Sequence, residues 1–195
     1  MNTTVALPDS KSERSSLIRL YAVRGVVAIA WASAFAAAHH TLDAVAVTLL
    51  VSYPLIDAVS SLIDYLAVAP GPDRRVTALN GALSSVAAVA LGIAATVGGV
   101  GAVLAVFGVW AVISGATQLA VGIHRRGPVL GKQWPTLISG GLSFLVGVFY
   151  LVQAIGPSPS LDVLSTYATG GGIFFIAQAA LLAWKSRAQR ASAAR

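Results

Sequence analysis

The sequence has no cysteine and very little charge. The absence of cysteine from all 195 residues excludes disulfides, thiolate metal sites and a cysteine nucleophile. Charged residues make up only 10% of the chain, whereas a soluble globular domain carries about 25%. Hydrophobic residues make up 56%, and the mean hydropathy is +0.79. These proportions exclude an ordinary soluble domain and indicate an integral membrane protein with a single domain.

Catalytic and nucleotide-binding motifs are also missing. The chain contains no G-x-S-x-G, H-E-x-x-H or P-loop pattern, and the glycine-rich stretch at residues 98–101 joins two apolar runs as a helix turn would. The formal net charge is +6, but the basic residues do not form an array interleaved with aromatic residues. We therefore expect no enzymatic activity, no catalytic residue, no cofactor and no nucleic-acid partner.

Six apolar runs are each close to the roughly 20 residues that cross a hydrocarbon core of about 30 Å. The predicted helices cover residues 17–38, 43–67, 77–97, 100–123, 136–155 and 161–184, within a transmembrane domain at 17–185. Residues 1–16 are expected to form a disordered cytoplasmic lead, and residues 186–195 a basic cytoplasmic tail. A secretory signal cleaved after Ala38 is the alternative for the first run, and Arg24 within that run argues against it.

Basic residues predict the orientation of these helices. Every Lys and Arg lies before or within the first run, in the second or fourth connection, or after the sixth run. They are Lys11, Arg14, Arg19, Arg24, Arg74, Arg75, Arg125, Arg126, Lys132, Lys185, Arg187, Arg190 and Arg195. Because basic loops stay on the cytoplasmic side, both termini are expected in the cytoplasm.

An internal repeat accounts for the even number of helices. Successive copies of the even-numbered helices are aligned 57 positions apart. The odd-numbered helices are aligned at a pair in which a variable residue is followed by glycine. The aligned segments are Tyr53–Ala58, Trp110–Gly115 and Tyr167–Gly172, and Arg24-Gly25, Asn80-Gly81 and Ser139-Gly140. The pattern predicts three copies of one antiparallel hairpin. Chance similarity among helices rich in Ala, Val and Gly is the alternative.

Glycine recurs every seven residues along the fourth run, at Gly101, Gly108, Gly115 and Gly122. This spacing places the four residues on one face of a helix. Small residues let two helix backbones approach closely in lipid. We therefore expect a neighbouring helix to pack against this face.

Two charges lie deep inside the first two runs. Arg24 and Asp57 are about equally far from the turn at His40, so they should lie at similar depth. An unpaired charge near the middle of a membrane helix costs on the order of 2.5–3.5 kcal/mol, which predicts an intramembrane ion pair between them. The pair would set the register of the hairpin or, alternatively, let Asp57 exchange a proton. Asp64, one heptad further, is a secondary acid that could share Arg24 or face water.

His39, His40 and Asp43 cluster in the turn that the charge pattern assigns to the periplasm. Histidine changes charge between about pH 5 and pH 8, so this turn is a candidate pH sensor. Two solvated, inert histidines are the alternative. Asp162 is the other acid expected on this side, which makes too small a ligand set for a metal, and no metal site is predicted.

These features resemble the HdeD-like acid-resistance membrane proteins. The resemblance rests on Arg24-Gly25 in the first helix and on an aromatic-x-x-x-Asp/Ser-Gly pattern at Trp110–Gly115 and at Tyr53–Ala58, where Ala58 replaces the glycine. It covers residues 18–185. It implies a non-enzymatic bacterial inner-membrane protein linked to acid stress. Membrane lipids, a second copy or another membrane protein are the expected partners. The alternative function is a small proton- or solute-translocating transporter or channel that uses Asp57.

Overall fold

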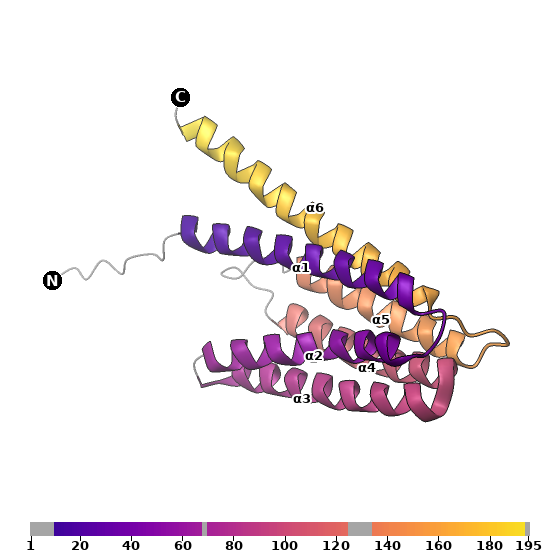
Figure 1. Ribbon diagram of the computed structural model, residues 1–195. Coiled ribbons are helices and arrows are strands. Elements are labelled where there is room, and N and C mark those ends of the chain that lie inside the picture. The colour runs from indigo at the N-terminus through magenta and orange to yellow at the C-terminus, as the bar shows by residue number, and fades with distance from the viewer. Residues whose placement is uncertain (1–9, 68–69, 125–133, 194–195) are drawn as a thin grey trace. The chain divides into compact units, whose positions relative to one another are not determined.

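The computed structural model describes residues 10–67, 70–124 and 134–193, which are helical apart from short turns. The helices are α1 (Ser10–Ala38), α2 (Ala44–Ala67), α3 (Pro72–Ile93), η1 (Ala94–Gly98), α4 (Gly99–His124), α5 (Trp134–Ala154) and α6 (Asp162–Ala193) (Figure 1). No strand occurs among the described residues. The expected all-α fold is therefore confirmed.

The helices have the length and composition of membrane spans. Five helical stretches of the described chain are long and apolar enough to cross a bilayer. They are Tyr21–Ala38, Ala44–Ile63, Arg74–His124, Leu137–Ala154 and Asp162–Trp184. This is a multi-pass membrane protein. The third stretch is 51 residues long because α3, η1 and α4 follow one another without a break.

Helix ends follow local sequence signals. Asp43 precedes α2, and its carboxylate accepts hydrogen bonds from the backbone N–H groups of Val45 (2.9 Å) and Ala46 (3.0 Å), as an N-cap does. Pro72 opens α3, where its missing N–H leaves no hydrogen bond unmade. Two helices extend beyond the apolar runs that predicted them. α1 begins at Ser10 rather than about Leu17, and α6 continues to Ala193, through most of the basic tail.

The chain divides into two compact units, where the sequence predicts one domain. One unit comprises Met1–Ala34 and Leu164–Arg195, and its described part consists of α1 up to Ala34 and α6 from Leu164 onward. The other unit is Phe35–Val163, which contains α2, α3, η1, α4 and α5, together with the last turn of α1 and the first two residues of α6.

A sharp turn separates α3 from α4. Gly99 has a φ of +72°, a backbone conformation that favours glycine because a Cβ atom would clash. At this point the chain reverses, so that α4 runs back antiparallel to α3 (Figure 1). The tight hairpin expected at Gly98-Gly99 is confirmed.

Glycine brings α4 and α5 into backbone contact. A Cβ atom added at Gly115 would lie 2.7 Å from the carbonyl oxygen of Gly140, and one added at Gly140 would lie 2.9 Å from that of Gly115. The same reciprocal contact joins Gly108 and Gly147, at 2.9 Å and 2.8 Å. A Cβ atom at Gly101 would lie 2.9 Å from the oxygen of Ala154. The glycine face expected on the fourth helix is therefore confirmed at Gly101, Gly108 and Gly115, and α5 is its neighbour.

Similar contacts occur in the other helix pairs. In the unit of α1 and α6, a Cβ atom added at Gly25 would lie 2.8 Å from the carbonyl oxygen of Gly172, and one at Gly172 would lie 2.9 Å from that of Gly25. Between α2 and α3, a Cβ atom at Gly81 would lie 3.2 Å from the Cβ of Ser61 and 3.8 Å from the oxygen of Ala58. Each of these helix pairs thus approaches through small residues.

Candidate functional site

A polar network centred on Asp57 joins α2 to α3. The Oδ2 atom of Asp57 accepts hydrogen bonds from the Asn80 amide (2.8 Å) and the Ser84 hydroxyl (2.7 Å). The Asn80 amide also donates to the hydroxyl of Ser61, at 2.9 Å. Ser61 and Ser84 are buried, with 7% and 0% of their surface exposed. Because polar groups without partners are costly in lipid, these bonds hold the two helices in one register.

Trp110 of α4 extends the network. Its indole N–H donates to the Ser84 hydroxyl at 3.0 Å, and the Ser84 hydroxyl in turn donates to Asp57. The Trp110 ring packs edge-on against Tyr53 and Phe107, with centroids 5.9 Å and 5.3 Å away. An aromatic cluster therefore covers the network on the α4 side.

Ser114, one turn after Trp110 on α4, differs from the hydrogen-bonded buried serines Ser61 and Ser84. It is 7% exposed, and its hydroxyl oxygen has no hydrogen-bond partner in the described structure. Nearby, the Ser139 hydroxyl of α5 donates to the side-chain oxygen of Gln118 at 3.2 Å. A buried hydroxyl without a partner costs about 1–3 kcal/mol, so this position is a weak point of the bundle.

Asp57 thus has hydrogen-bond partners that the predicted ion pair did not include. In its own unit, Asp57 is bonded by neutral donors of α3. Arg24 belongs to the unit of α1 and α6, and its pairing with Asp57 stays a prediction. The side chain of Asp64, the predicted secondary acid, lies outside the described part of the structure.

At the other end of α2, His39 connects two turns that are far apart in the sequence. Its Nε2 atom pairs with the carboxylate of Asp162, the first residue of α6. Its Nδ1 atom lies 3.0 Å from the carbonyl oxygen of Phe35. The His39 side chain is 8% exposed, whereas that of Asp162 is 70% exposed. A nearly buried imidazole therefore links the α1–α2 turn to the start of α6.

Both nitrogens of the His39 ring face oxygen atoms that only accept hydrogen bonds. A carbonyl group has no proton to donate, and neither has an ionised carboxylate. Neutral histidine carries one N–H and can satisfy one of these two oxygens. The imidazolium carries two and can donate to both, so the geometry suits the protonated ring.

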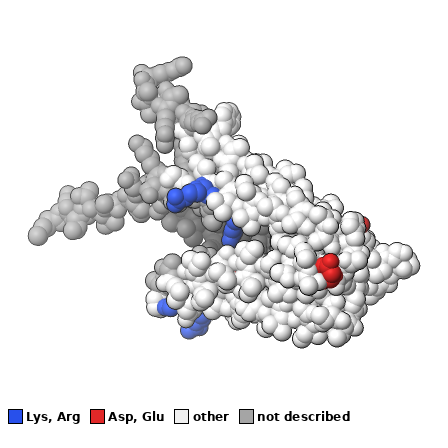
Figure 2. Space-filling view, viewed as in Figure 1, with Lys and Arg blue, Asp and Glu red and all other residues white. Residues whose placement is uncertain are grey.

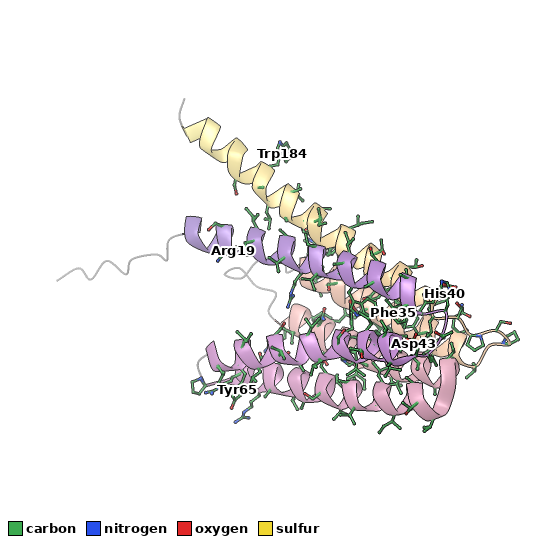
Figure 3. All side chains as sticks on the ribbon, in the orientation of Figure 1. Arg19, Phe35, His40, Asp43, Tyr65 and Trp184 are labelled. Carbon is green, nitrogen blue, oxygen red and sulfur yellow. The ribbon has the colours of Figure 1, made fainter. Side chains whose placement is uncertain are left out.

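His40 and Asp43, the other two residues of the predicted sensor, lie in the same turn (Figure 3). His40 is exposed, and its ring centroid is 4.7 Å from that of His39. The backbone N–H of Ala46, followed by that of Val45, lowers the pKa of Asp43, because both hydrogen bonds favour the ionised carboxylate. The structure thus brings His39 to Asp162 and leaves Asp43 as a helix cap.

The sequence reasoning missed the partners of both charged sites. The sequence pattern places Asn80 only in the repeat and Asp162 only in a ligand set too small for a metal, and it assigns no role to Ser84. A polar residue within an apolar run was the available signal for Asn80 and Ser84. The described residues contain no group of three His, Cys, Asp or Glu that could hold a metal ion.

Comparison of the chain with protein-family models, curated proteins and solved structures finds no match.

Proposed function

We propose that this chain is a non-enzymatic bacterial inner-membrane protein of the HdeD-like kind that contributes to acid tolerance. We further propose that it crosses the membrane six times, as three copies of one hairpin with both termini in the cytoplasm. The His39–Asp162 pair is the observation that carries the acid response.

Six crossings are supported by the length of the third stretch. A straight α-helix of 51 residues would be about 75 Å long, which is more than twice the hydrocarbon thickness of about 30 Å. The chain reverses at Gly99 within this stretch, so α3 and α4 each have a suitable length for one crossing.

The repeat is supported by equivalent contacts. The small residues that meet in the three helix pairs occupy matching repeat positions. They are Ala58 with Gly81, Gly115 with Gly140, and Gly172 with Gly25. The Asn80–Ser61 bond also has a counterpart in Ser139–Gln118. Each copy therefore packs its second helix against the first helix of another copy.

The His39–Asp162 pair can respond to acid because of its geometry. Both ring nitrogens of His39 face acceptor oxygens, so a second N–H on the ring would add a hydrogen bond and tighten the contact between the two turns. His40 and Asp43 are the other ionisable groups of this turn, and the ring centroids of His40 and His39 are 4.7 Å apart.

Survival at low external pH tests the proposal. A strain lacking the gene should survive less well than one complemented by the wild type. His39→Gln and Asp162→Asn should fail to complement at equal expression, whereas His40→Gln, the neighbouring exposed histidine, should complement. The joint His39→Ala and His40→Ala variant should fail as well. Survival that does not depend on the gene would refute the acid-tolerance role.

The Arg24–Asp57 ion pair remains part of the proposal. If the two charges pair in the membrane, Arg24→Ala or Asp57→Ala alone should lower thermal stability more than the double change does, because a single variant leaves one charge buried without its partner. Equal losses in all three variants would favour Asn80 and Ser84 as the sufficient partners of Asp57.

Translocation through Asp57 is the second candidate. The carboxylate within the membrane-spanning helices favours it, because such groups mark proton routes. Proton flux into liposomes containing the purified protein should then be lost in Asp57→Asn. Flux equal in wild type and variant would exclude this candidate.

A further inference from the structure

Arg74 lies over an aromatic ring at the turn between α2 and α3. Its guanidinium carbon lies 4.2 Å from the centroid of the Tyr65 ring. Tyr65 belongs to the last turn of α2, and Arg74 to the first turn of α3. The face of an aromatic ring attracts a cation, so Tyr65 restricts the orientation of the guanidinium plane.

The hydrogen-bond donors of Arg74 have no acceptor within the described chain. Its Nε atom is buried there without a partner, and no ion pair or hydrogen bond of its guanidinium group is found among the described residues. An arginine carries five N–H donors along the edge of its plane. The N–H groups of Arg74 are therefore available to an acceptor that is not part of the protein.

The location of this pair matches the surface of a membrane. The α2 span ends at Ile63 and the next begins at Arg74, so Tyr65 lies at the boundary between apolar helix and water. Arg75 is exposed beside Arg74. Figure 2 shows basic side chains at this end of the unit and acidic ones toward the opposite end. Leu66, which is 71% exposed, offers an apolar surface next to Tyr65.

We propose that Arg74, Arg75 and Tyr65 bind the phosphate group of an anionic glycerophospholipid. The planar guanidinium fits two phosphate oxygens, and Arg75 adds a second positive charge. Anionic lipids supply such phosphates at the depth where these residues lie. The apolar neighbours favour a lipid over a soluble phosphate, because they can contact its acyl chains.

Binding of phosphatidylglycerol to the full-length protein in phosphatidylcholine nanodiscs tests the site. Arg74→Gln should weaken the binding about tenfold, the loss expected for one charge-assisted hydrogen bond. Arg19→Gln removes an exposed arginine of α1 and should leave the binding unchanged. Equal losses in both variants would indicate a general effect of charge and overturn the site.

Two further variants separate stacking from charge and from misfolding. Arg74→Lys keeps the charge but loses the planar group, so it should bind more weakly than the wild type. Tyr65→Leu keeps both arginines and should also bind more weakly. Melting temperatures in pure phosphatidylcholine should equal that of the wild type for each variant. Wild-type affinity in Arg74→Lys and Tyr65→Leu, or complete competition by glycerol phosphate, would overturn the proposal.

Discussion

The carboxylate of Asp57 depends on α3 for its hydrogen bonds. Asn80→Ala would remove the amide that bonds both Asp57 and Ser61, so we expect it to lower the free energy of unfolding by about 1–3 kcal/mol. Ser85→Ala is a matched control, because the Ser85 hydroxyl is exposed and bonds only the carbonyl of Gly81 on its own helix. Thermal melting in detergent should separate the two variants. A loss no larger in Asn80→Ala than in the control would contradict the importance of the network.

The Ser114 hydroxyl has no hydrogen-bond partner among the described residues, and a substitution at Ser139 can test the reason. In the α2–α3 pair, Asn80 donates two hydrogen bonds, whereas the equivalent Ser139 has one hydroxyl hydrogen and donates it to Gln118. Ser139→Asn would supply a donor for Ser114 as well, and we expect a gain of about 1 kcal/mol in stability. In a Ser114→Ala background the same change should bring no gain. A lower melting temperature for Ser139→Asn alone would show that an amide does not fit there.

Asp43 makes the stability of the protein depend on pH. Its pKa is lowered in the folded protein by the N–H groups of Ala46 and Val45, so it stabilises the fold above its unfolded pKa. This contribution is lost as the pH falls through the lower, folded value. Asp43→Asn carries no such charge, so its melting temperature should change less than that of the wild type between about pH 6 and pH 3. Identical pH profiles would contradict the role of the Asp43 charge.

At the scale of helices, the α4–α5 pair depends on the absence of side chains. A Cβ atom at Gly115 would clash with the backbone nitrogen of Phe144, which cannot move without shifting α5. Gly115→Ala should therefore destabilise the protein by about 1–3 kcal/mol, despite the better helix propensity of alanine. Gly141→Ala is the control, because its Cβ atom would meet nothing closer than 4.0 Å. Equal melting temperatures for these two variants would contradict the close packing.

Sequence periodicity predicts which face of a helix packs closely against a neighbour. The seven-residue spacing of glycine predicts a close contact on the fourth helix, because periodicity defines a face. It does not name the helix on the other side. The repeat favoured pairing within each copy, α1 with α2, α3 with α4 and α5 with α6. In the structure the glycine face of α4 meets α5, and α2 bonds to α3. Packing partners depend on shape complementarity between faces, which a single helix does not encode.

At the scale of the whole molecule, the number of crossings can be measured with single cysteines. The natural chain has none, so each introduced cysteine is the sole thiol. With six crossings, Thr41→Cys and Ser158→Cys should react with a membrane-impermeant maleimide in intact cells, and Gly71→Cys only after permeabilisation. If the 51-residue stretch crossed once, Ser158→Cys would be protected together with Gly71→Cys. The labelling of Ser158→Cys therefore decides between six crossings and five.

The sequence by itself determined that this is an all-helical membrane protein, and it located most helix ends. Span length, apolar composition and turn residues such as Gly99 and Pro72 are local properties, and helices in lipid must satisfy their backbone hydrogen bonds within each segment. The sequence also indicated Asp57, because it is a charge within an apolar run, and His39, because it is a histidine in a predicted turn. The extensions of α1 and α6 were missed because those turns are polar and carry no apolar signal.

Only the tertiary structure decided which groups meet. Asp57 and Asn80 are separated by 23 positions, and His39 and Asp162 by 123, and no periodic pattern connects residues on different helices. Their contacts arise because small residues set the distance and register of each helix pair, which then brings particular polar side chains together. The chemistry of each residue is local, whereas its partner is a property of the packed bundle.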